Sequence, residues 1–191
     1  GRLWPGVTIS VPPALVLATE CFDRYLAQNG LRDLALNSRD DEKILAEFLR
    51  AALPRDVVKK LRAFVEEVRS PLAVRSSSLL EDSQYQPFTG VYETFMLPNN
   101  HPDARVRLRH LLIAVRRVYA STFLRQAKDY LHATPYRLEE EKMAVAIQRV
   151  VGKHHGNRYY PDFSGVSRSY NYYPTPPATS EDGVAAVALG M

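Results

Sequence analysis

Apolar residues recur at helical spacing through much of the chain and predict four helices. In each of them one face is apolar and the opposite face is polar, as in helices that pack against a core. The first helix is expected to stop at Asn29-Gly30, and the last one, over residues 103–132, is expected to break once near Ser121. The predicted helices begin at Thr19, Ser38, Pro54 and Asp103.

Runs of β-branched and aromatic residues predict strands before, between and after these helices. Pro12 and Pro13 cannot donate to a ladder, so the first run is expected to be an extended segment that ends in a short strand. The last run, Val184–Leu189, is apolar throughout and is predicted to be a buried strand. Helices come first and strands follow around the long helix, which favours an α+β fold over a regular strand–helix alternation. The predicted extended and strand segments are 7–17, 71–76, 91–97, 143–151, 156–173 and 184–189.

The composition is that of a globular protein, and it narrows the classes of function. Apolar residues make up 46% of the 191 residues, which is enough for one domain, or for two small lobes with a shared core. The net charge is +4, and acids interrupt the basic residues, which makes nucleic-acid binding the least favoured interpretation. No apolar stretch is long enough to span a membrane, and the single cysteine fits a reducing compartment. We therefore expect a cytoplasmic protein that binds neither membranes nor nucleic acid.

The sequence Arg75-Ser76-Ser77-Ser78 is the most informative candidate site. An arginine at the end of a predicted strand, followed by three serines, puts a guanidinium and several hydroxyl and amide donors in one turn. A guanidinium fork matches the oxygens of a phosphate, and turn amides can form an anion-binding concavity. The spacing alone leaves two interpretations open, a phosphate site and a surface arginine before a serine turn.

Other polar groups give weaker signals. Glu81 and Asp82 fit contacts to Mg²⁺ or to a sugar hydroxyl, and they equally fit acids of a solvated loop. Gly90 lets the backbone approach a ligand closely, but a single glycine also fits a plain hairpin turn. The five histidines show no metal-ligand spacing with one another or with Cys21, so no metal-binding residue is predicted.

Two motifs lie close together near the middle of the chain. Residues 75–82 read R-S-S-S-L-L-E-D, and residues 88–95 read F-T-G-V-Y-E-T-F. This pair resembles the V-R-S-S-A-x-x-E-D and F-A-G-Q-x-E-T-F patterns of the ATP-binding domain shared by phosphoenolpyruvate synthases, pyruvate phosphate dikinases, glucan water dikinases and rifampicin phosphotransferases. Further blocks match in the same order, so the resemblance spans nearly the whole chain. They are residues 11–17, 143–151, 165–167 and 184–190.

The resemblance implies an ATP-grasp-like fold, in which two α+β lobes close on ATP, and it implies Mg²⁺ as a further cofactor. It assigns Arg75 as the catalytic residue that contacts the ATP phosphates, and the segment around Gly90 as the loop that covers them. The strand over residues 143–151 lies at the adenine edge in that family. The nucleotide-binding residues implied in this way are Arg75, Ser76, Gly90, Val91, Gln148, Arg149, Val150 and Val151.

Members of the family use ATP to phosphorylate a histidine on a separate domain, and that phosphohistidine then phosphorylates pyruvate on a third domain. The resemblance therefore implies a phosphoenolpyruvate synthase-like, ATP-dependent phosphotransferase. Its phosphohistidine and pyruvate-binding domains are expected elsewhere in the same parent chain. Two alternatives stay open: a dikinase-type enzyme with another acceptor, such as a drug or a glucan, and a degenerate ATP-sensing or partner-binding module without catalysis.

The chain departs from the family pattern near both ends. The Gly-Lys-Gly segment expected before Val11 is absent, and the last strand carries no acid where the family has Mg²⁺-binding acids. No T-x-H phosphohistidine motif is present either. We therefore expect residues 1–191 to be a partial ATP-binding domain, incomplete at both ends and inactive by itself. If the domain has two lobes, their boundary is expected near residues 135–142.

Overall fold

The computed structural model describes residues 6–78, 80–81 and 90–190 of the chain. The chain divides into two compact units, residues 1–149 and 150–191. Residues 135–142, where the sequence suggested a boundary between lobes, lie inside the first of these units.

The first unit combines a four-stranded sheet with a layer of helices. Its helices are α1 (Thr19–Gln28), α2 (Arg32–Asn37), α3 (Asp41–Arg50), α4 (Arg55–Glu67), α5 (Ala104–Ser121), α6 (Arg125–His132) and the short 3-10 helix η1 (Leu138–Glu140). Its strands are β1 (Ala14–Leu17), β2 (Leu72–Ser77), β3 (Thr94–Leu97) and β4 (Ala144–Arg149). This mixture of helices and antiparallel strands confirms the predicted α+β class.

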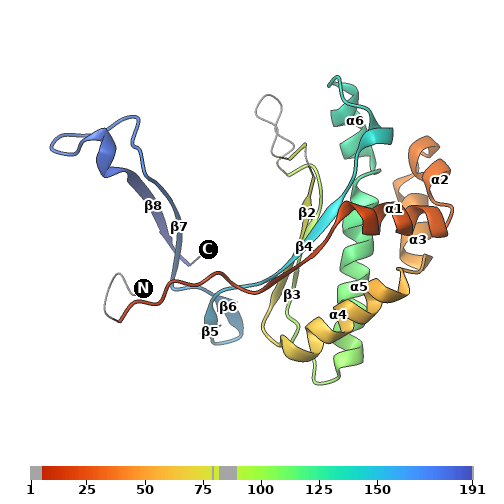
Figure 1. Cartoon of the computed structure of the whole chain (residues 1–191), viewed down its shortest axis with the longest axis horizontal. Coiled ribbons are helices and arrows are strands. Elements are labelled where there is room, and N and C mark those ends of the chain that lie inside the picture. Colours follow the sequence, from red (N-terminus) through yellow and green to blue (C-terminus); the bar gives the residue numbers. More distant parts are fainter. Residues whose placement is uncertain (1–5, 79, 82–89, 191) are drawn as a thin grey trace. The chain divides into compact units, whose positions relative to one another are not determined.

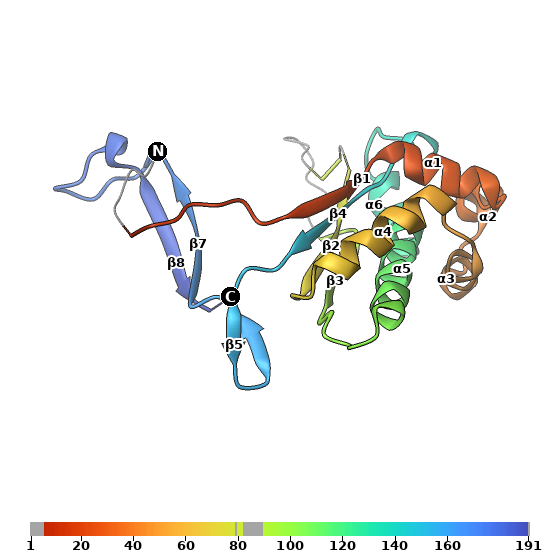
Figure 2. The ribbon, with the colours of Figure 1, turned by 60° about the horizontal axis from the view of Figure 1, so that its bottom comes forward.

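The sheet has one buried face and one open face. Its strands are antiparallel in the order β1-β4-β2-β3, so β4 and β2 are central. Residues alternate between the faces, and on β2 Leu72 and Val74 are buried while Arg75 is exposed. Val145 and Ile147 of β4 belong to the same buried face. Figures 1 and 2 show the helices on this one side, where α5 contacts β2 and β3 and α1 contacts β4.

Aromatic rings form the centre of the helical layer. Tyr119 of α5 packs against Phe22 and Tyr25 of α1, with ring centroids 5.1 and 5.4 Å apart. Phe48 of α3 lies 5.8 Å from both Tyr25 and Phe123. All five side chains are almost fully buried, and each contributes roughly 1.5–3 kcal/mol by leaving water. Packing of these rings fixes α1, α3 and α5 relative to one another.

The helices stop and break where the sequence predicted. Asn29 is the C-cap of α1, and Gly30 follows it with a φ of 62°, which favours glycine. The long helical pattern divides at Ser121, where α5 ends, and α6 begins at Arg125. The Ser121 hydroxyl donates to the carbonyl of Val118 at 2.7 Å. Such a bond from a side chain competes with the backbone hydrogen bonds of the helix and so favours the end of α5 at this position.

The predicted helix starts need two corrections, and one helix is additional. Thr19 is the first residue of α1 rather than its cap, and the cap, Ala18, makes no side-chain hydrogen bond. Asp40, not Ser38, caps α3, because its carboxylate accepts from the N–H of Lys43 at 3.0 Å. The six-residue α2 was not predicted, since it is too short to show a clear helical period.

A buried arginine joins two parts of the helical layer, and no ion pair among the described residues involves it. Arg107 of α5 is 2% exposed and donates to the carbonyl of Val65, 2.7 Å away near the end of α4. It also donates to the carbonyls of His101 and Pro102, at 2.7 and 3.2 Å. Carbonyls at a helix C-terminus have no partner in the helix and carry partial negative charge, so they can hold a buried cation.

The second unit consists of two antiparallel strand pairs. β5 (Lys153–His155) pairs with β6 (Arg158–Tyr160), and β7 (Phe163–Arg168) pairs with β8 (Val184–Leu189). A 3-10 helix, η2 (Ser180–Asp182), precedes β8. All six residues of β8 are exposed, so the prediction of a buried strand is wrong. A two-stranded hairpin lacks a second layer, and an apolar sequence alone does not bury it.

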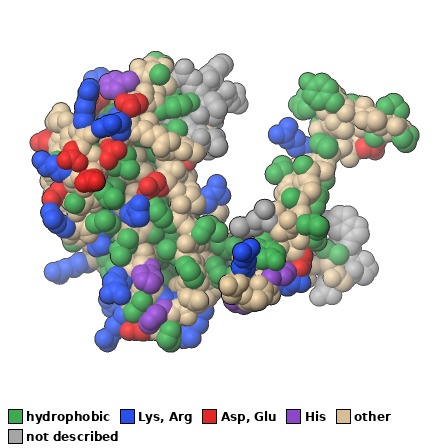
Figure 3. Space-filling model, turned by 180° about the vertical axis from the view of Figure 1, so that it is seen from behind, with side chains coloured by type: hydrophobic (Ala, Val, Ile, Leu, Met, Phe, Trp, Pro, Cys, Tyr) green, Lys and Arg blue, Asp and Glu red, His purple; other side chains and the backbone are tan. Residues whose placement is uncertain are grey.

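The surface carries charges of both signs. Figure 3 shows Lys and Arg side chains interspersed with Asp and Glu on the face of the first unit that it displays. Several exposed pairs lie close together, such as Arg24 and Asp56 at 2.6 Å. Within the described ranges, no helix is long and apolar enough to cross a membrane.

We expect Arg107→Ala to lower the free energy of unfolding by about 2–4 kcal/mol, because it removes three charged hydrogen bonds and leaves the Val65 carbonyl buried without a partner. Urea unfolding followed by circular dichroism measures this change. Arg109→Ala, an exposed arginine on the same helix, is the control and should change the stability by less than about 0.5 kcal/mol. Equal effects of the two substitutions would contradict the role assigned to Arg107.

Candidate functional site

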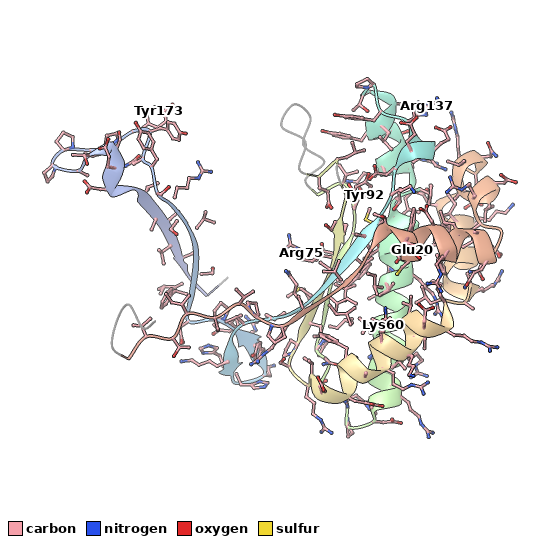
Figure 4. The ribbon with its side chains drawn as sticks, in the orientation of Figure 1. Glu20, Lys60, Arg75, Tyr92, Arg137 and Tyr173 are labelled. Carbon is pink, nitrogen blue, oxygen red and sulfur yellow. The ribbon has the colours of Figure 1, made fainter. Side chains whose placement is uncertain are left out.

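Arg75 lies on the face of the sheet that the helices leave uncovered. Its neighbours in the register are Thr94 on β3 and Ala146 on β4. Figure 4 shows its side chain on the side of the sheet away from the helical layer. None of the ion pairs within the described ranges involves Arg75. Its guanidinium is therefore available to an anionic ligand.

Small side chains surround Arg75 on this open face. Val16 and Met96 are 63% and 54% exposed, which shows that no layer of the first unit covers the face. Alanines occupy several positions, and their short side chains leave the sheet accessible to a flat ligand. The open face consists of Ala14 and Val16 of β1, Ala73, Arg75 and Ser77 of β2, Thr94 and Met96 of β3, and Ala144, Ala146 and Gln148 of β4.

The sheet register brings Arg75 and Gln148 onto the same face, although they belong to separate sequence motifs. Gln148 lies opposite Ala73, two residues from Arg75 along β2. The spacing of residues in a strand puts Gln148 and Arg75 about 7 Å apart along the strand direction. A cation and an amide thus lie on adjacent strands with small residues between them, which is an arrangement able to hold an extended anionic ligand.

The remaining residues of the predicted adenine edge lie at or beyond the end of β4. Arg149 is exposed, and its N–H donates to the carbonyl of Pro13 at 3.0 Å. Val150 and Val151 belong to the second unit. The structure therefore groups Gln148 with Arg75 and does not place Val150 or Val151 beside them.

The turn after β2 is closed by its own side chains. Glu81 accepts from the Ser76 hydroxyl at 2.7 Å and from the Ser78 N–H at 3.0 Å. The Ser78 hydroxyl in turn accepts from the N–H groups of Leu80 and Glu81, at 3.2 and 3.4 Å. The side chains of Ser76 and Ser78 are thus engaged within the turn, whereas the side chains of Arg75 and Ser77 are exposed on the open face. Glu81, whose role the sequence left open, closes the turn.

A buried carboxyl group lies beside this turn. Glu141 is 8% exposed, and its carboxylate accepts from the hydroxyl of Tyr92, itself 5% exposed, at 3.0 Å. Burial raises the pKa of Glu141; hydrogen bonds from Ser78 and Tyr92 oppose this effect, and the charge of Glu81 adds to it. Burial likewise raises the pKa of Tyr92, whose position in the first unit is marked in Figure 4.

The segment that begins at Gly90 is attached to the junction of α5 and α6. Gly90 has a φ of 79°, and its carbonyl accepts from the side chain of Gln126 at 3.4 Å. The Glu93 N–H donates to the Ser121 hydroxyl at 3.2 Å, so the helix break supplies a contact to the candidate site. Val91, the next predicted residue, is partly buried in this segment. Asp82, Phe88 and Thr89 of the two motifs lie outside the described residues.

The described acids of the candidate site show no metal-binding cluster. The described part of the chain contains no group of three or more His, Cys, Asp or Glu side chains placed to hold a metal ion. The carboxylates of Glu81 and Glu141 are engaged by serine and tyrosine donors. We therefore assign neither carboxylate as a ligand of Mg²⁺.

Three polar residues of the site were not found from the sequence. Tyr92 and Glu141 are 49 positions apart, and no local pattern connects them. Ser121 was recognised only as the place where a helix breaks, and its contact with Glu93 spans 28 positions. Tyr92 lies within the motif F-T-G-V-Y-E-T-F, which is the signal for this group in the sequence.

Comparison with known proteins gives a match to almost the entire chain. A family model described as "Pyruvate phosphate dikinase, AMP/ATP-binding domain" matches residues 1–190. A protein named "Probable phosphoenolpyruvate synthase" from Staphylothermus marinus is 27% identical over 165 residues, which cover 75% of this chain and 19% of that protein. The phosphoenolpyruvate synthase of Aeropyrum pernix is 25% identical over 164 residues, with the same coverage of both chains.

A third relative carries a different name. The rifampicin phosphotransferase of Streptomyces sviceus is 29% identical over 198 residues, which cover 96% of this chain and 20% of that protein. The chain thus spans about a fifth of the length of the curated relatives that it matches.

We expect the stability of the protein relative to Glu141→Gln to fall as the pH rises. The pKa of Glu141 is raised in the folded state, so the folded state favours the protonated form. The stability gained from protonation is fully present below the unfolded pKa, near 4.5, and it is lost as the pH rises through the raised folded pKa. Urea unfolding of both proteins between pH 4 and pH 8 measures this difference. A difference that stays constant with pH would contradict the raised pKa.

Proposed function

This chain belongs to the pyruvate phosphate dikinase AMP/ATP-binding domain family, and we propose that it is the ATP-binding part of a phosphoenolpyruvate synthase-like phosphotransferase. The observation that carries the proposal is the open face of the sheet. Arg75 and Gln148 come from two separate blocks of the family resemblance, residues 75–82 and 143–151, and they lie on that face with small residues between them.

In this proposal the open face binds ATP, with its phosphates at Arg75 and its adenine toward the end of β4. A guanidinium without an acidic partner suits phosphate oxygens, which it meets through a planar pair of N–H donors. Gln148 lies toward the opposite end, about 7 Å along the strand direction, where Arg149, Val150 and Val151 follow in the chain. The fold proposed for the complete domain is ATP-grasp-like.

Arg75 would act as the catalytic cation of this site. Phosphoryl transfer depends mainly on the positioning of the phosphates and on the stabilisation of their charge, both of which an unpaired guanidinium supplies. Ser76, Gly90 and Val91 would form the edges of the phosphate end of the site, through backbone groups. The proposed ligand is ATP together with Mg²⁺, and no described residue is assigned as a ligand of the ion.

The remainder of the reaction is proposed to lie outside this chain. The relatives are about five times as long as the matched segment. In this proposal, domains of the parent protein carry the histidine that receives the phosphoryl group and the site where pyruvate becomes phosphorylated. The isolated chain is then expected to bind ATP without completing the reaction.

A second candidate acceptor is a drug rather than pyruvate. It is favoured by the match to a rifampicin phosphotransferase, which covers 96% of the chain, against 75% for the phosphoenolpyruvate synthases. Both candidates use the same ATP site and differ only in the acceptor. Transfer of the labelled phosphoryl group from ATP to pyruvate or to rifampicin by the full-length protein distinguishes them. Transfer to neither, with ATP binding intact, would favour a non-catalytic ATP-sensing module.

We expect Arg75→Ala in the full-length protein to raise the dissociation constant of ATP by about 10- to 100-fold, because charged hydrogen bonds contribute about 1.5–3 kcal/mol each. Isothermal titration calorimetry in the presence of Mg²⁺ measures this constant. Arg62→Ala, an exposed arginine on α4 in the helical layer, is the control and should leave the constant unchanged. Unchanged ATP binding in Arg75→Ala would refute the assignment of the phosphate site.

A further inference from the structure

Three separate segments of the first unit meet at one buried carboxyl group. Glu141 precedes β4, and its carboxylate accepts a hydrogen bond from the Tyr92 hydroxyl at 3.0 Å. The Ser78 side chain lies close enough to Glu141 to lower its pKa. Ser78 follows β2, and Tyr92 precedes β3. β3 and β4 are the two strands that flank β2 in the sheet. The carboxyl of Glu141 therefore joins the ends of all three strands on the side where Arg75 leads into its turn.

A carboxyl group at this position is unfavourable for stability taken alone. Glu141 is 8% exposed, and none of the ion pairs within the described ranges supplies it with a cation. The nearby carboxylate of Glu81 adds a second negative charge. An amide of similar shape would avoid the cost of burying the charge and could still accept a hydrogen bond from Tyr92. The benefit of the arrangement must therefore lie in the geometry that it imposes.

That geometry leads back to Arg75 through a series of contacts. The Ser78 side chain lies beside Glu141, and its hydroxyl accepts from the N–H groups of Leu80 and Glu81. The carboxylate of Glu81 then accepts from the hydroxyl of Ser76, which adjoins Arg75 in the chain. The hydrogen bonds of this series are buried or half-buried, so we expect a change at Glu141 to reach the backbone at the end of β2.

We infer that Glu141 is a positioning residue: by binding the Tyr92 hydroxyl beside Ser78, it holds the turn after β2 so that Arg75 meets the phosphates of ATP. The inference rests on the proposed function, because the ligand of Arg75 is ATP only under that proposal. Glu141 itself does not touch the ligand. It faces the buried side of the strand ends, and Arg75 lies on the open face.

The test uses Tyr92→Phe in the full-length protein, which removes one hydroxyl without leaving a large cavity. Its dissociation constant for ATP, measured by calorimetry, should rise by about five- to tenfold, and the amides of Leu80 and Glu81 should exchange faster with solvent. Tyr25→Phe is the matched control, since it removes a buried hydroxyl that donates to the Phe48 carbonyl in the helical layer. The control should lower the melting temperature similarly and leave the ATP constant unchanged.

A double-mutant cycle separates positioning from a general loosening of the fold. If Glu141 acts through Arg75, Tyr92→Phe should weaken ATP binding little further once Arg75 is replaced by Ala. Glu141→Gln, which still accepts from the Tyr92 hydroxyl, should keep the ATP constant within about twofold, whereas Glu141→Leu should raise it as Tyr92→Phe does. Additive losses in the cycle, or an equal loss of affinity in Tyr25→Phe, would overturn the inference.

The Arg75→Ala variant by itself tells which proposal has failed. If Arg75→Ala leaves ATP binding unchanged, the proposed function is refuted, and the positioning role falls with it. If Arg75→Ala weakens ATP binding and Tyr92→Phe does not, only the positioning role of Glu141 is refuted.

Discussion

The antiparallel pairing of β2 with β4 is the interaction on which the rest of the first unit depends. Its register runs from Leu72 opposite Arg149 to Ser77 opposite Ala144 and joins the two central strands of the sheet. If the register of β2 against β4 shifted by one residue, Arg75 would face the helices and Val74 would be exposed. Because Val74 packs in the apolar core, the same burial that stabilises the fold also fixes the direction of Arg75.

The helices cover only one face of the sheet, and the candidate site lies on the other face. The helical layer takes up the large side chains, such as Leu72 and Ile147, and the opposite face carries alanines around Arg75 and Gln148. An antiparallel sheet tolerates this difference between its faces, since polar and small residues alternate with apolar ones along each strand. ATP, in the proposed function, binds to the face that the core does not use.

Long-range polar contacts help to hold the ends of the strands. Glu141 binds Tyr92, and the Ser121 hydroxyl at the end of α5 accepts from the backbone of Glu93. The break between α5 and α6 therefore also has a role in the site, because the Ser121 hydroxyl at the break binds the backbone of Glu93 in the segment that follows Gly90. These contacts are few, and each one joins elements that are distant in the sequence, so the loss of one side chain affects several strands.

The sequence by itself determined the longer elements of the first unit, its α+β class and the motifs that identify the family, because helical and strand periods and turn residues act over a few neighbouring positions. It also placed the break of the long helix at Ser121 and the end of the first helix at Asn29-Gly30. It missed the short α2 and η1. Only the tertiary structure decided that Arg75 and Gln148 share one face and that Glu141 meets Tyr92, because pairing across 49 or more positions depends on register and packing. The same reason explains the error at β8: its apolar sequence favours burial, but burial requires a second layer, which a hairpin does not supply by itself.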